Sequence, residues 1–138
     1  MATKFDFLDE NSVVVVIGAY KGENVELIGL NSQPNLVLFE PIEEYCHTLR
    51  KKFSNYPSTV EVHETAIGIA NKTAFISLDS DASSVVAGGQ GDSIAIKVST
   101  FDDYHSRIIK RYGTIDLLFV NCEGCEYEFL TDILRNGW

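Results

Sequence analysis

The stretch VVVVIGAYKGENVELIGL, residues 13–30, decides the fold. Its first five residues are four valines and an isoleucine, a pattern typical of a strand buried on both faces of a parallel sheet. A glycine turn from Gly18 to Gly22 follows, and residues 23–30 are predicted to form a short helix. The residues available to pack this helix are Val25, Leu27, Ile28 and Leu30. Nucleotide sites often begin where a buried strand enters a helix through a glycine turn, so this turn is the first candidate binding site.

Strands and helices alternate along the rest of the chain. Further strands are predicted over residues 35–40, 59–63 and 115–120, and amphipathic helices over residues 42–53, from residue 100 onward, and over residues 127–135. Residues 74–78 and 94–98 read as an antiparallel strand pair beside the parallel sheet, joined by a serine-rich loop over residues 79–93. This order predicts an α/β fold with a mainly parallel sheet, its strands arranged third, second, first, fourth.

The helix that starts near residue 100 has its own signals. Thr100 is placed to cap it, and acidic residues occupy its first turn. The side chains expected to be buried are Phe101, Tyr104, Ile108 and Ile109.

Length, charge and cysteine content limit the possible classes of function. The chain has 138 residues, which suits one domain over residues 13–138 after a short leader over residues 1–12. A net charge of −9 argues against nucleic acid or an anionic membrane as a partner, because phosphates would be repelled. No signal peptide or membrane span is evident, and three cysteines then indicate reduced thiols in a cytoplasm. A small-molecule substrate is therefore expected, and the oligomeric state is left open.

Three stretches should meet at the carboxyl ends of the parallel strands, where α/β folds bind ligands: residues 18–23, 40–41 and 121–126. A dinucleotide fingerprint needs a glycine where this chain has Tyr20. A phosphate loop ends in G-K-[ST], whereas Gly22 is followed by the anion Glu23. The turn therefore favours a nucleoside that carries no phosphate and has a positive charge.

Glu40 narrows the choice of ligand. It lies 22 residues after Gly18 at the end of the second strand, where an acid can accept hydrogen bonds from both hydroxyls of a ribose. A ribose held by an acid beside an acidic, phosphate-free turn points to S-adenosylmethionine, whose sulfonium is a cation.

Five motifs, in order, resemble those of the FkbM-type methyltransferases, which have the Rossmann-like class I methyltransferase fold. They span residues 13–134 and read GAYKG at 18–22, FEP at 39–41, AIG at 66–68, TFDD at 100–103 and FVNCEGCE at 119–126. The resemblance implies transfer of a methyl group from S-adenosylmethionine to a hydroxyl of a small molecule or sugar. The cofactor-binding residues it implies are Gly18, Ala19, Tyr20, Gly22, Glu40, Pro41, Glu64 and Ala66. The residues it places at the methyl group and the substrate are Asn121, Glu123 and Glu126.

The chain departs from these motifs at three positions. Val16 stands where the family has an acid, and Phe119 and Asn121 stand where it has a lysine and an aspartate. Asn121 cannot act as a base, so proton removal would fall to Glu123, Glu126 or water. A protein that keeps the cofactor pocket but has lost catalysis is therefore an alternative to an active enzyme.

A redox function is a second alternative. Cys122 and Cys125 form a C-x-x-C pair after a buried strand, but neighbouring glutamates should raise the pKa of both thiols and so disfavour reactivity. No metal site is predicted, because the three histidines are scattered singly.

The strand over residues 115–120 reads IDLLFV and would form one edge of the sheet. Natural edge strands are rarely this apolar, because open backbone groups invite aggregation. The methyltransferase fold normally adds about three strands beyond this one, so the natural polypeptide is expected to run on. The 138-residue chain alone is expected to self-associate.

Overall fold

The computed structural model describes residues 7–77, 84–86 and 93–121. The parallel strands are β1 (Val13–Ile17), β2 (Asn35–Phe39), β3 (Val60–His63) and β8 (Leu117–Val120). The helices are α1 (Glu23–Ser32), α2 (Glu43–Lys52) and α3 (Phe101–Tyr112). The remaining strands are β4 (Ala66–Gly68), β5 (Lys72–Ser77), β6 (Ser84–Val86) and β7 (Ser93–Thr100).

The first sheet has the order β3-β2-β1-β8, and every pairing in it is parallel. The strand order predicted from the sequence is therefore confirmed, as is an α/β fold with a parallel sheet. Val14 of β1 lies opposite Leu36 of β2 on one side and Leu117 of β8 on the other. Because parallel strands end at the same side of a sheet, β1, β2, β3 and β8 share one edge, called here the carboxyl edge.

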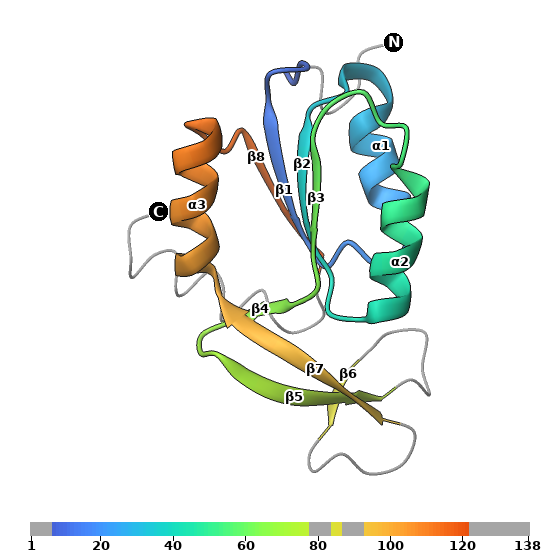
Figure 1. The fold of residues 1–138 in the computed structure, drawn as a ribbon, viewed down its shortest axis with the longest axis vertical. Helices are drawn as coiled ribbons and strands as arrows, with labels where there is room; N and C mark the ends of the chain where they lie inside the picture. Colours follow the sequence, from blue (N-terminus) through green and yellow to red (C-terminus); the bar gives the residue numbers. More distant parts are fainter. Residues whose placement is uncertain (1–6, 78–83, 87–92, 122–138) are drawn as a thin grey trace.

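Helices cover both faces of this sheet, with α1 and α2 on one face and α3 on the other (Figure 1). Side chains alternate along each strand, so β1 packs Val13, Val15 and Ile17 toward α3 and Val14 and Val16 toward α1 and α2. All five are at most 2% exposed. Burial on both faces is the physical reason for the unbroken β-branched run in the sequence.

The other strands form a second sheet of order β4-β7-β5-β6. The antiparallel pairing of β5 with β7 was predicted, but the two strands do not extend the parallel sheet: β4 pairs parallel with β7, and β6 pairs antiparallel with β5. The predicted loop over residues 79–93 thus contains a strand. This sheet buries one face, where Ala74, Ile76, Ile96 and Val98 pack against Ile42.

The second sheet adjoins the carboxyl edge of the first (Figure 1). Only Glu64 and Thr65 separate β3 from β4, and β7 continues into α3 without an intervening residue. The buried hydroxyls of Thr65 and Ser99 lie 2.7 Å apart and join the two connections.

Three details differ from the sequence predictions. Leu27 is 65% exposed because α1 covers the sheet through Val25 and Ile28, which lie three residues apart on one face. Ile109 is 37% exposed, at the rim of a face formed by Phe101, Tyr104 and Ile108. Thr100 occupies the N-cap of α3, but its side chain makes no capping bond; its N–H instead donates to the Asn71 Oδ1 atom at 3.0 Å.

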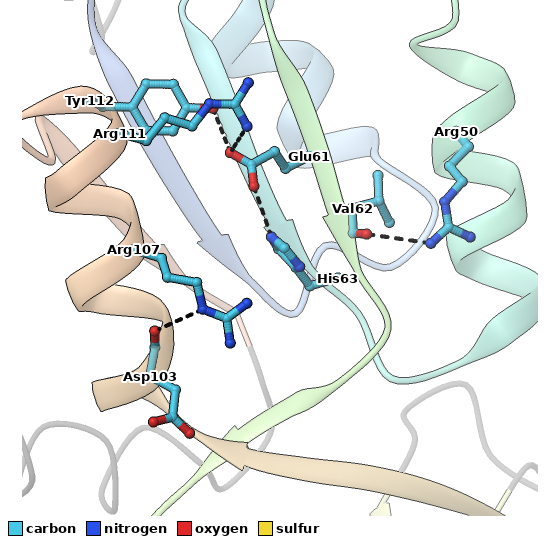
Figure 2. A network of polar contacts seen from close by, with 8 residues as sticks. All are labelled: Arg50, Glu61, Val62, His63, Asp103, Arg107, Arg111 and Tyr112. Carbon is cyan, nitrogen blue, oxygen red and sulfur yellow. Dashed lines mark hydrogen bonds and ion pairs between the residues drawn. The ribbon is translucent and has the colours of Figure 1, made fainter.

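Edge strand β3 is tied to both helical layers by polar side chains (Figure 2). Glu61 accepts a hydrogen bond from the Tyr112 hydroxyl at 2.5 Å and forms an ion pair with Arg111 at 3.0 Å, both on α3. It also lies 3.1 Å from His63 Nε2. On the other side, Arg50 of α2 donates to the Val62 carbonyl at 3.4 Å. Burial and the bond to Glu61 raise the pKa of Tyr112, so its hydroxyl stays a donor.

Replacing Glu61 with glutamine should lower the free energy of unfolding by about 1–2 kcal/mol, because the amide has one acceptor oxygen in place of two and carries no charge to pair with Arg111. Urea denaturation would measure the loss. Glu64→Gln is the matched control, since Glu64 is exposed and lies just past the same strand. Equal denaturation midpoints for the two variants would mean that the Glu61 cluster does not hold α3 on the sheet.

Candidate functional site

The glycine turn between β1 and α1 is closed by backbone bonds to the end of β2. The N–H groups of Gly18 and Ala19 both donate to the Phe39 carbonyl, at 2.9 and 3.1 Å, and Gly22 N–H donates to the Ala19 carbonyl at 3.0 Å. Gly18 and Gly22 have φ of 83° and 91°, a region that favours glycine. Tyr20 also lies in the left-handed region, with φ of 52°, although it carries a side chain.

Glu40 sits inside this arrangement and is 1% exposed. Its Oε1 accepts the Tyr20 N–H at 3.0 Å, and its Oε2 accepts the Ile42 N–H at 2.8 Å. Burial raises the pKa of the Glu40 carboxyl to about 7, although both backbone bonds act to lower it. The same residue's carbonyl accepts the Cys46 thiol at 2.9 Å, and burial together with the Glu40 charge raises the pKa of that thiol to about 12.

The direction of these N–H groups bears on the kind of ligand. A phosphate site at a helix start needs backbone N–H groups that point outward at the anion. Here the N–H groups of Gly18, Ala19 and Tyr20 point inward, to the Phe39 carbonyl and the Glu40 carboxylate. Exposed Glu23 opens α1 and adds a second negative charge where a phosphate would lie. The three N–H groups are therefore used within the protein, and a turn without phosphate stays a prediction.

Asn121, the first residue of the predicted stretch 121–126, lies beside the glycine turn. Its N–H donates to the Ile17 carbonyl at 2.8 Å, so it follows β8 directly beside Gly18, and it is half-buried. The ends of β1, β2 and β8 therefore meet at the carboxyl edge. The other predicted catalytic residues, Glu123 and Glu126, lie outside the described residues.

Two further predicted cofactor residues follow β3. Glu64 is exposed, and half-buried Ala66 opens β4. Pro41 is half-buried between Glu40 and α2. Gly18–Gly22 and Glu40–Pro41 are thus joined by direct hydrogen bonds, whereas Glu64 and Ala66 stand at the neighbouring strand end.

Residues predicted only to pack α2 also contact the turn. Ile42 supplies one of the two N–H groups on Glu40, and the Tyr45 ring lies 5.5 Å from the Lys21 ammonium in a cation–π contact. Ile42 and Tyr45 also pack against the second sheet. The start of α2 therefore links the glycine turn to that sheet, a link that hydrophobic spacing alone could not reveal.

The departures at Val16 and Phe119 prove to be spatial partners. The two residues are in register on the adjacent strands β1 and β8. Val16 is 0% exposed, and both pack in the apolar cluster beneath α1 and α2. An acid and a lysine at these positions would face each other in neighbouring strands, and this chain replaces both with apolar residues. Exchanging an ion pair for a packed apolar pair is often neutral for stability.

Metal clusters and membrane spans can be judged over the described residues, and the cysteine pair lies beyond them. Over residues 7–77, 84–86 and 93–121, no group of three or more histidines, cysteines or acids could hold a metal ion. In the same part of the chain, no helix is both long and apolar enough to span a bilayer. Cys122 and Cys125 lie outside the described residues, so the redox interpretation is untested.

Comparison of the chain with known protein families, curated proteins and solved structures found no match. The likeness to FkbM-type methyltransferases therefore rests on the five sequence motifs alone. What the structure adds is the meeting of three of the motifs, at Gly18–Gly22, Glu40–Pro41 and Asn121, on one edge of a parallel sheet.

Proposed function

We propose that this protein binds S-adenosylmethionine at the carboxyl edge and transfers its methyl group to a hydroxyl of a small molecule or sugar in the cytoplasm. The observation that carries the proposal is the buried Glu40 carboxylate, bonded to the glycine turn at the end of β2. A negative charge built into the turn suits a cationic nucleoside and opposes a phosphate.

The Glu40 carboxylate has acceptor capacity to spare for a ribose. A carboxylate offers about four acceptor sites, and two are used by the N–H groups of Tyr20 and Ile42. Glu40 is 1% exposed, so two hydroxyls of a ribose could use the remainder only once the ligand displaces part of its surroundings. Hydrogen bonds to a charged group are the stronger kind. The sulfonium end of the cofactor would then extend along the turn toward Asn121.

The reaction is a displacement that depends on alignment. Bound S-adenosylmethionine would supply the methyl group: the acceptor hydroxyl oxygen would bond to the methyl carbon while the carbon–sulfur bond breaks and its electron pair stays on sulfur, giving S-adenosylhomocysteine. The hydroxyl proton leaves to Glu123, Glu126 or water. Asn121 can orient the acceptor by hydrogen bonding, but its amide cannot take up the proton.

A protein that binds the cofactor without catalysis is the second candidate, and Asn121 favours it. Val16 and Phe119 are weaker evidence for a loss of catalysis, because both departures fall at facing positions and leave a packed apolar contact. Turnover with an acceptor separates the two candidates, since only the enzyme converts the cofactor.

Calorimetric titration tests the proposal directly. S-adenosylmethionine and S-adenosylhomocysteine should bind, while ATP and NAD should bind more weakly because Glu23 and Glu40 oppose their phosphates. Glu40→Ala should weaken nucleoside binding at least about tenfold, since hydrogen bonds to a shielded charge contribute roughly 1.5–3 kcal/mol each.

The control variant is Glu44→Ala, an exposed acid on the first turn of α2. Equal or tighter binding of ATP would contradict the proposal. A dissociation constant unchanged by Glu40→Ala would remove Glu40 from the site. An acceptor screen on the binding-competent protein then decides between the enzyme and the binding protein.

A further inference from the structure

Tyr20 is the residue of the glycine turn whose conformation needs an explanation. It adopts φ of 52° with a side chain present, and a left-handed conformation at such a residue persists only where surrounding contacts hold it. The turn's other left-handed positions, Gly18 and Gly22, are glycines and need no such support. One contact that reaches the Tyr20 backbone from the end of β2 is made by the Glu40 Oε1 atom, at 3.0 Å.

Glu40 is built to make this contact. Its second oxygen is held by the Ile42 N–H at 2.8 Å, and its own N–H donates to the His63 carbonyl at 3.1 Å, so both ends of the residue are fixed. The side chain is 1% exposed, and water therefore does not compete for its oxygens. One carboxylate thus joins the end of β2, the start of α2 and the turn that leads into α1.

We infer that Glu40 is a positioning residue for the glycine turn, and that its ionised carboxylate holds Tyr20 and the turn in the conformation that receives the nucleoside. The role is distinct from contact with a ribose, because it operates before any ligand binds. The positioning role depends on the proposed function only in its predicted effect on ligand affinity.

Protonation should release the turn. A carboxylate accepts both N–H groups as a charged partner, whereas the carboxylic acid loses its charge and turns one oxygen into a hydroxyl donor. Since burial raises the pKa of Glu40 to about 7, the change falls near neutral pH. With Glu40 buried in both forms, the sign follows from the two backbone bonds. They lower its pKa, so the ionised form makes them more strongly, and the turn should be held more firmly above pH 7 than below it.

Other titratable or charged groups lie around Glu40 among the residues that the structure describes. The Glu40 charge helps to raise the pKa of the Cys46 thiol of α2 to about 12, so this thiol stays neutral between pH 5 and 9. Glu43 and Arg50 of α2, and Glu64 after β3, act on that same thiol. Lys21 in the turn faces the Tyr45 ring. His63 stacks on Phe39, and its carbonyl accepts the Glu40 N–H at 3.1 Å, so His63→Gln is the necessary control.

The test follows backbone amides of the ligand-free protein by NMR between pH 5 and 9. The Tyr20 and Ile42 amide protons should both move downfield as pH rises, with one shared midpoint near 7. The Gly113 amide, which donates to the Ile109 carbonyl at 2.8 Å, is the internal reference and should not move. His63→Gln should leave the shared midpoint in place. A Tyr20 amide that stays flat while Ile42 titrates would overturn the inference.

A second measurement uses Glu40→Gln, which keeps the shape but offers one acceptor oxygen. The Tyr20 amide should then exchange with solvent at least about tenfold faster, and trypsin should cut after Lys21 at least about tenfold faster, than in wild type or in the control Glu44→Gln. Unchanged exchange and cleavage in Glu40→Gln would show that the carboxylate does not hold the turn.

Binding supplies the third measurement, with S-adenosylhomocysteine as the probe. Its affinity should fall by up to about tenfold per pH unit below pH 6, because only the ionised, held turn receives the nucleoside. If the probe does not bind while the amides titrate as expected, the proposed function fails and the positioning role stands. If the probe binds with an affinity independent of pH, the link between Glu40 ionisation and ligand affinity is refuted.

Discussion

Phe39→Ala should lower the free energy of unfolding by roughly 3–5 kcal/mol, the loss typical of a large aromatic removed from a tight core. Phe39 is 0% exposed at the end of β2. Its ring centre lies 4.9 Å from that of Tyr104 and 6.1 Å from that of Phe101, both edge-to-face, and 5.2 Å from the stacked His63 ring. Truncation therefore removes three ring contacts and leaves a cavity between the sheet and α3.

Chemical denaturation would measure this loss, provided that the unfolding free energy falls with denaturant concentration at the same slope in variant and wild type. Phe75→Ala is the matched control, because Phe75 is 37% exposed on the second sheet and should lose less than about 1 kcal/mol. A similar loss in both variants would mean that the contact between α3 and the parallel sheet is not the main core. A milder core substitution, Phe39→Leu, keeps the measurement possible if the alanine variant does not fold.

Gly22→Ala should lower the free energy of unfolding more than Gly113→Ala does, although the two glycines have nearly the same backbone conformation. Their φ values are 91° and 87°, so a side chain at either one incurs the left-handed strain of about 1–3 kcal/mol. At Gly22 an added Cβ would also lie 3.0 Å from Leu49 Cδ2, 3.2 Å from Lys52 Cδ and 3.3 Å from Phe53 Cε2. Leu49 is 0% exposed, so other atoms surround its side chain and a shift there disturbs the core.

The difference between these two variants isolates the packing of the glycine turn. At Gly113 an added Cβ meets nothing within 4 Å, so strain is the whole cost there. Overpacking should add about 1–3 kcal/mol at Gly22, measured as the gap between the two unfolding free energies. Equal losses would mean that α2 yields to the added carbon and that the turn is not fixed against it.

The parallel sheet was accessible from the sequence because its signals are local. The run from Val13 to Ile17 marks a strand buried on both faces, and the spacing of Phe101, Tyr104 and Ile108 marks a helix with one buried face. The second sheet could not be predicted from the sequence in full, since β4 has three residues and its partner residues Val98–Thr100 lie 32 residues further along the chain. Strand pairing between residues so far apart in the chain produces no periodic pattern in the sequence.

The candidate site was predicted by position but not by geometry. Spacing placed Glu40 at a strand end near the glycine turn, and that placement holds. The bond from Tyr20 N–H to the Glu40 carboxylate depends on the left-handed φ of Tyr20, and a tyrosine gives no sign of that conformation in a sequence. The roles of Glu123 and Glu126 stay predictions.

The connections of the second sheet leave it no hinge. Domain closure needs a few residues at element ends that are able to absorb large changes of φ and ψ. Here β7 passes into α3 with no residue between, and the two residues that join β3 to β4 include Thr65, which is 1% exposed and bonded to Ser99. The sheet and α3 must therefore move as one piece, against the packed core of α3, or not at all. If a ligand binds at the carboxyl edge as proposed, it would meet a second sheet that is already in place, and little of its binding energy would go into ordering the protein there.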